Sequence, residues 1–181
     1  GDGKSNWIFE SNSQIRLQGS SEAYCISQKN LFGNTAGVHD VLVNLDVSVD
    51  ADSVMDNSHS PENMIDGNLS SYWASGVFPD GYEHIVHVTL DLNKVVEISK
   101  IKISWEFAPL HYQISTSLDN QSYQLMGENF ANPSIVTVDT LKNTETRYIK
   151  ITMIRPHPNH GLMGDQFLYG IRSIEVQANH L

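Results

Sequence analysis

Alternation of apolar and polar side chains constrains this chain more than any other feature of its sequence. In residues 86–92, Val, Val, Leu and Leu alternate with His, Thr and Asp. Because successive side chains of a strand point to opposite faces, such a run buries one face and exposes the other. The same pattern occurs in residues 101–105, 112–116, 134–138, 148–154 and 172–176. No segment has a sustained helical period, so we predict an all-β chain, a sandwich or a barrel.

Turn-forming residues separate these runs and divide the chain. Gly, Pro, Asn, Asp and Ser are concentrated in five predicted loops: residues 56–68, 74–82, 117–122, 127–133 and 156–170. Residues 1–45 are less regular, with short candidate strands at 7–9, 15–17 and 24–26. A lead segment of this size buries too little surface to be stable alone. We expect it to pack against the main domain, with a boundary near residue 45.

Charge and cysteine content exclude several classes of function. Twenty-one acidic and eleven basic residues give a net charge of −10, which disfavours nucleic acid and anionic membrane lipid as partners. The charge is equally explained by solubility.

Cys25 is the only cysteine, so no disulfide forms within the chain; the residue is either a buried thiol or has a partner outside the sequence. No apolar stretch is long enough to span a membrane.

A dense group of polar residues occupies positions 63–73, called here the Asp-Gly loop. Its side chains offer oxygen ligands, and Gly67 permits a sharp turn, as a hard cation such as Ca²⁺ requires. The loop is not an EF-hand: counting from Asp66, the twelfth position is Val77 where a bidentate Glu would be needed. From spacing alone, a tight turn ahead of a buried Trp73 explains the same residues.

The order of the motifs resembles the discoidin, or coagulation factor V/VIII C-type, superfamily over residues 46–178. The resemblance rests on Ser60-Pro61, Asp66-Gly67-Asn68, Trp73, residues 88–92, 101–105 and 112–120, residues 147–151 and residues 174–176. It implies an antiparallel, jelly-roll-like β-sandwich of the galactose-binding type in a secreted or cell-surface protein. The cysteines that join the ends of many blood-coagulation members are absent here, which favours the carbohydrate-module or adhesin branches.

The resemblance also implies a structural Ca²⁺. Carried over by position, the side-chain ligands would be Asp66, Ser71 and Glu175, with backbone oxygens near Asn63 and Asn68. Without a metal, we expect Glu175 to be an exposed residue of a late strand. One departure lies in a turn, where the usual Asp-Gly is Asp119-Asn120; Asn tolerates a left-handed φ nearly as well.

The lead segment has a weaker resemblance of its own. Residues 1–30 are vaguely similar to one repeat of a ricin-type lectin. That likeness implies a larger adhesive protein with neighbouring domains, such as the LCCL/lectin adhesive-like proteins of apicomplexan parasites.

Catalytic motifs are missing, so we expect no enzyme. The sequence has no G-x-S-x-G elbow, no H-E-x-x-H and no phosphate-binding glycine loop. His84 and His87 should not chelate one metal, because strand residues three apart face opposite ways. His157 and His160 share a loop that is either a metal site or, as we favour, a solvated polar turn.

Binding is therefore expected in the loops at one end of the sandwich. A sugar site needs an aromatic face beside amide, imidazole or charged groups, and the candidates are Phe78, His111, Arg155, His157, Asn159, His160 and Phe167. We assign Trp73 and Trp105 to the core. The predicted ligand is a glycan or glycoprotein. The alternatives are membrane lipid, bound through Val77-Phe78 and Leu162-Met163, or a role as accessory carbohydrate-binding module of a glycoside hydrolase.

Overall fold

A computed structural model describes residues 7–9, 15–17, 24–25 and 46–179, and every structural statement below concerns this part of the chain. Apart from two short 3-10 helices, its regular structure consists of β-strands. In chain order the elements are β1 (Trp7–Phe9), β2 (Ile15–Leu17), β3 (Tyr24–Cys25), β4 (Ser48–Ala51), η1 (Asn57–His59), η2 (Pro61–Met64), β5 (Trp73–Ala74), β6 (Val86–Phe107), β7 (Pro109–Ser117), β8 (Gln124–Asn129), β9 (Val136–Pro156), β10 (Leu162–Met163), β11 (Gln166–Phe167) and β12 (Gly170–Asn179). No described helix is long and apolar enough to cross a membrane.

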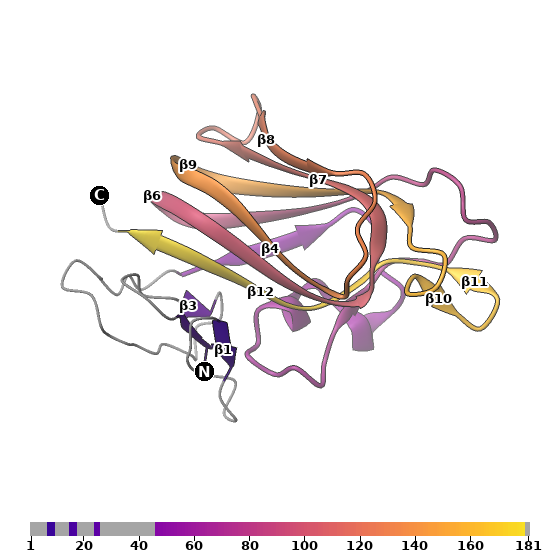
Figure 1. The fold of residues 1–181 in the computed structure, drawn as a ribbon. Coiled ribbons are helices and arrows are strands. Elements are labelled where there is room, and N and C mark those ends of the chain that lie inside the picture. The colour runs from indigo at the N-terminus through magenta and orange to yellow at the C-terminus, as the bar shows by residue number, and fades with distance from the viewer. Residues whose placement is uncertain (1–6, 10–14, 18–23, 26–45, 180–181) are drawn as a thin grey trace.

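Two long strands, β6 and β9, build both layers of the sandwich. Residues 86–91 of β6 pair with residues 148–153 of β9, and residues 100–104 pair with residues 136–140. Between these stretches the register shifts, and Asn93 adopts a left-handed φ of 67°. The paired strands therefore turn a corner and return, as Figure 1 shows.

The two layers enclose one apolar core. The first layer joins β4, the first half of β6, the second half of β9, β7 and β8; the second joins β12, β5 and the remaining halves of β6 and β9. Trp73 and Trp105 are buried between the layers, as predicted. The Trp73 Nε1 donates to the Ser53 carbonyl at 3.0 Å, and Trp105 Nε1 donates to Thr137 Oγ1 at 3.0 Å. The predicted all-β antiparallel sandwich is confirmed.

Most predicted strands are present, but five strands of the main domain were not predicted: β4, β5, β8, β10 and β11. The runs at 86–92 and 101–105 belong to the single strand β6, and those at 134–138 and 148–154 fall largely within β9. The predicted loop at 127–133 was wrong in its first residues, because β8 extends to Asn129. This edge strand pairs only with β7 and buries little of its surface, so its sequence does not alternate clearly.

The three candidate strands of the lead segment are also found. β1 pairs with β2, and β3 adds to the outer edge of β12, opposite Glu175 and Val176. The candidate strand at 24–26 ends at Cys25, and Ile26 lies outside the described residues. The side chain of Cys25 is not described, so both interpretations of its thiol stay open.

Candidate binding site

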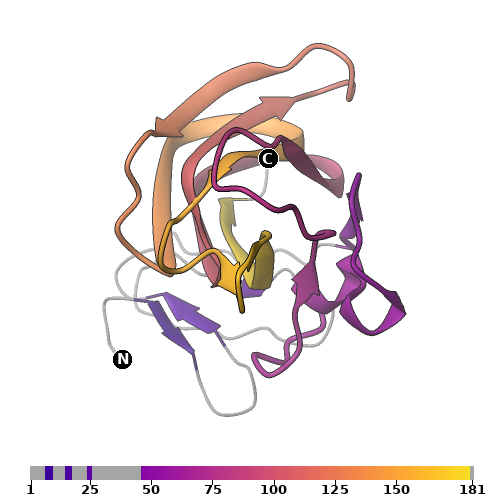
Figure 2. The same cartoon turned by 90° about the vertical axis from the view of Figure 1, so that its right-hand side faces the viewer.

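The loops gather at one end of the sandwich, called here the loop end. It comprises residues 75–85, 130–135 and 157–169 with the short turn between β6 and β7, and Figure 2 looks onto it. Backbone hydrogen bonds join these segments: Phe78 and Phe167 exchange two, at 2.8 and 2.9 Å, and Ala108 N donates to the His160 carbonyl at 2.9 Å. Loops tied in this way lose little conformational freedom when a ligand binds.

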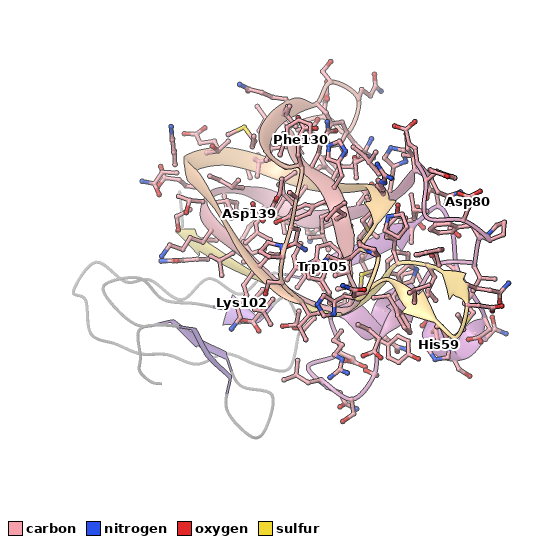
Figure 3. All side chains as sticks on the ribbon, turned by 45° about the vertical axis from the view of Figure 1, so that its right-hand side comes forward. His59, Asp80, Lys102, Trp105, Phe130 and Asp139 are labelled. Atoms are coloured by element: carbon pink, nitrogen blue, oxygen red, sulfur yellow. The ribbon has the colours of Figure 1, made fainter. Side chains whose placement is uncertain are left out.

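His111 forms the most strongly organised side-chain group at this end. Its Nε2 lies 2.6 Å from Glu128 Oε2, which also accepts from Gln113 Nε2 at 2.9 Å. These two bonds hold the pKa of Glu128 below its usual value, with the His111 bond as the larger cause. The ring of Phe130 stacks on His111 with centroids 4.6 Å apart and is 66% exposed. The group therefore presents an aromatic ring above a fixed imidazole; Figure 3 labels Phe130 in the upper part of the molecule.

Arg155 connects this group to the neighbouring loop. It is the cross-strand partner of His111 in the β7–β9 pair, and its Nε donates to the Gly81 carbonyl at 3.1 Å. Its terminal guanidinium nitrogens make no hydrogen bond to any described residue, and the side chain is exposed. An arginine held at Nε with its fork free is suited to bind ligand oxygens.

Phe78 differs from the prediction. It is only 5% exposed, with His84 stacked on it at 3.9 Å and Tyr169 packed beside it at 5.5 Å. Phe78 thus offers a ligand little of its ring, and His84 presents the outer aromatic face of the pair. Phe167 is half-buried, and its ring lies against Gly81. A Cβ atom at position 81 would come within 3.0 Å of Phe167 Cζ.

His157, Asn159 and His160 form one polar turn. The Nδ1 of His157 accepts from the backbone N–H groups of Asn159 and His160, each at 3.0 Å. A nitrogen that accepts two hydrogen bonds is unprotonated, so His157 is neutral here. Burial, and secondarily His160, lower the pKa of His157. His157 therefore closes the turn, while the side chains of Asn159 and His160 are exposed.

The Asp-Gly loop contains four of the five predicted calcium ligands, and hydrogen bonds join three of them: Asp66, Asn68 and Ser71. Asp66 accepts from Asn68 N at 2.9 Å and from Ser71 Oγ at 2.5 Å, and Gly67 has a φ of 75°. Asn63 donates its side-chain amide to the carbonyls of Ser58 and Tyr72, at 2.9 and 3.0 Å. A carboxylate beside hydroxyl and carbonyl oxygens fits the chemistry of a hard cation. The same bonds also stabilise the turn without one.

Glu175, the fifth predicted ligand, lies on β12 and is fully buried. We expected an exposed residue in the absence of a metal, and that expectation was wrong. Neither carboxylate oxygen has a hydrogen-bond partner among the described residues, which is a costly arrangement that a bound cation would relieve. Burial raises the pKa of Glu175 well above its usual value, while Lys102, its cross-strand partner, opposes that rise. The described residues hold no cluster of three His, Cys, Asp or Glu side chains placed for a metal. The calcium site stays a prediction.

His84 and His87 have separate partners, as expected for an H-x-x-H pair on extended chain. His84 stacks on Phe78, whereas His87 Nδ1 lies 2.8 Å from Asp52 Oδ2. Sequence reasoning missed His84 and Phe130 in the loop end, and Glu128 beside it in β8. Phe130 could have been found, because it is an aromatic residue within a predicted turn-rich loop.

Comparison with known proteins identifies the family. The F5/8 type C domain family matches residues 48–164, well over half of the chain. No curated protein matches the sequence. The match begins after the lead segment, so the likeness of residues 1–30 to a ricin-type repeat, and with it an apicomplexan source, gains no support.

Solved structures share the fold at low identity. Chitosan-binding module 1 of a chitosanase/glucanase from Paenibacillus sp. IK-5 superposes with a TM-score of 0.61 at 16% identity, over 73% of this chain and 95% of that one. Module 2 of the same enzyme, in complex with chitotriose, gives 0.61 at 18%, over 73% and 96%. The family 32 carbohydrate-binding module of Clostridium perfringens NanJ, in complex with galactose, gives 0.59 at 19%, over 72% and 93%. This chain belongs to the F5/8 type C, or discoidin, domain family, and its sandwich is a non-catalytic binding module.

Proposed function

We propose that this chain is an extracellular carbohydrate-binding module that attaches its parent protein to a glycan or glycoprotein through the loop end. The observation that carries the proposal is the exposed Phe130 ring stacked on His111, beside the free guanidinium fork of Arg155. The apolar face of a sugar ring packs on an aromatic side chain, and its hydroxyls need fixed charged or polar partners. Exposed Asn159 and His160 extend the polar rim.

The folds of the similar proteins support the same class of ligand. The three similar structures are a chitosan-binding module, a module in complex with chitotriose and a module in complex with galactose, and all have the same sandwich fold. A role as accessory module of a larger enzyme is compatible with this proposal. The same fold occurs within a family 89 glycoside hydrolase of Clostridium perfringens, of which the matching part is 14% of the chain.

A glycan array with the purified domain tests the proposal. We expect binding to a restricted set of glycans, and Arg155→Ala should abolish or strongly weaken it. Leu118→Ala, which removes an exposed apolar side chain from the opposite end, is the control and should bind normally. Absence of binding to every glycan would overturn the proposal in favour of protein–protein adhesion.

Membrane lipid is the second candidate, because the loop end carries exposed apolar side chains. Tyr82 is 69% exposed, and Val77 and Met163 are exposed on adjacent loops joined by the Phe78–Phe167 pair. The net charge of −10 opposes anionic headgroups. Sedimentation with liposomes containing phosphatidylserine should therefore show no binding, and clear salt-resistant binding would favour the lipid alternative.

A further inference from the structure

A hollow of about 270 Å³ lies on the outer face of the first layer, away from the loop end. It is lined by Ser48, Val49, Asp50, Thr89, Asp91, Asn120 and Tyr148. Apart from Val49, these residues offer carboxylates, hydroxyls, an amide and one aromatic ring. None of these residues takes part in the loop end.

The register of the strands explains how these residues come together. Across β4, β6 and β9, Ser48, Asp91 and Tyr148 form one cross-strand row, and Asp50 and Thr89 belong to the next. Neighbouring strands are about 4.8 Å apart, so a row spans roughly 10 Å, which is the scale of one or two sugar rings. We call this group, with Asn120, the sheet platform; β4, β6 and β9 are labelled in Figure 1.

Contacts around the hollow hold its side chains in place. Arg147 binds Asp91 through two nitrogens, at 2.9 and 3.1 Å, and its guanidinium carbon lies 5.1 Å from the centroid of the Tyr148 ring. Asn120, with a left-handed φ of 62°, accepts from the Tyr123 hydroxyl at 2.5 Å. These contacts place Asp91, Tyr148 and Asn120 before any ligand arrives.

The balance of charge indicates what the hollow would accept. Asp91 is paired with Arg147, and Lys150, the cross-strand neighbour of Thr89, has its Nζ 4.1 Å from the centroid of the Tyr123 ring. Asp50 is exposed, and its carboxylate has no hydrogen bond or ion pair to any described residue. A ligand that donates hydrogen bonds and carries positive charge would pair with Asp50, and the net charge of −10 would attract it.

We propose that the sheet platform is a second glycan site, specific for an amine-bearing sugar. The sugar ring packs on Tyr148 and its ammonium group binds Asp50, while hydroxyls reach Thr89 and Asn120. The site shares with the proposed function only the premise that the ligand is a glycan. Two sites on one domain could bind one long glycan chain or two separate chains. Simultaneous binding at both sites would raise the overall affinity through avidity.

Amide chemical-shift mapping by nuclear magnetic resonance tests the platform with three probes. The first is a glucosamine trimer, the second its N-acetylated counterpart, and the third is spermidine, which carries three amines but no ring. We expect the glucosamine trimer to shift the amides of Asp50, Thr89 and Tyr148. The acetylated trimer should shift them much less. If spermidine produces the same shifts, simple attraction of cations explains them and the sugar site is overturned.

Substitutions identify the two contacts. Asp50→Asn should raise the Kd of the glucosamine trimer about two- to fivefold, as expected for an exposed charge pair. Tyr148→Ala should weaken binding further, whereas Tyr148→Phe keeps the ring and should bind normally. Glu62→Gln removes the same charge outside both sites and should leave the Kd unchanged. Melting curves establish that each variant is folded.

The mapping separates this proposal from the first one. Shifts confined to Gly81, His111 and Phe130 would overturn the sheet platform and leave the loop end standing. Shifts confined to the platform would support it and count against the loop end. Shifts at neither set would overturn the platform.

Discussion

The Asp-Gly loop and the loop end are both polar, yet they are held together in different ways. In the Asp-Gly loop, the bonds of Asp66 and Asn63 reach residues at most nine positions away. In the loop end, the bonds join segments far apart in sequence: Arg155 reaches Gly81, and Phe78 pairs with Phe167. A local network can be recognised from consecutive residues. A long-range one exists only after the sandwich has formed.

The largest effect should come from Trp73, the last residue of the Asp-Gly loop. Trp73→Ala removes a fully buried ring and its bond to Ser53, and should cost about 3–5 kcal/mol of unfolding free energy. Urea denaturation measures this change. Tyr82→Ala in the loop end, at a largely exposed position, is the control and should change stability by at most about 0.5 kcal/mol. Similar losses for the two variants would contradict the distinction between the regions.

Calcium should affect the two regions differently, because only the stability of the Asp-Gly loop is expected to depend on it. A cation that binds the native state alone adds about 2.7 kcal/mol at a hundredfold excess over its Kd. We therefore expect a chelator to lower the melting temperature of the wild type and to have little effect on Asp66→Ala. If the chelator does not change the melting temperature of the wild type, and Asp66→Ala is still destabilised, the loop is a structural turn and the calcium site is contradicted.

The buried carboxylate of Glu175 gives a smaller effect with a definite sign. Its folded-state pKa is raised by burial, so without metal its stabilising contribution is complete below the unfolded pKa and is lost as pH rises. In metal-free buffer, the stability of the wild type relative to Glu175→Gln should fall as pH rises above the usual pKa of a glutamate side chain. Bound calcium would hold Glu175 ionised and remove or reverse this trend. A pH-independent difference between the two proteins would contradict the burial.

The smallest effect is expected at the ion pair beside the sheet platform. Arg147 holds the pKa of Asp91 below its usual value, chiefly through their hydrogen bonds. The pair is partly exposed, so Asp91→Asn should cost less than about 1 kcal/mol at neutral pH. Because the folded pKa is lowered, this contribution is present above the unfolded pKa and is lost in acid. A difference from wild type that grows below pH 4 would contradict this assignment.

Much of the fold was readable from the sequence because burial on one face leaves a period of two. This alternation correctly predicted a strand at residues 86–92. It also correctly placed Trp105 in the core. The edge strand β8 was missed because it buries little. The bend of β6 at Asn93 was also not predicted from the sequence, because it depends on the pairing of β6 with β9.

The candidate site was predictable only in part. The loops that carry it were identified by their turn residues, and His111 and Arg155 proved to be cross-strand neighbours. Whether an aromatic ring in a loop faces solvent depends on what covers it. Phe78 is covered by His84, whereas Phe130 stands above His111, and no local pattern distinguishes them.

Calorimetric titration of Phe130→Ala with the glycan that binds best on the array tests the central claim most directly. Stacking on an exposed aromatic ring contributes about 0.5–1.5 kcal/mol, so Kd should rise roughly two- to twelvefold. Leu118→Ala, at the opposite end, should have the wild-type Kd. Equal affinities for wild type and Phe130→Ala would contradict a glycan site at the loop end.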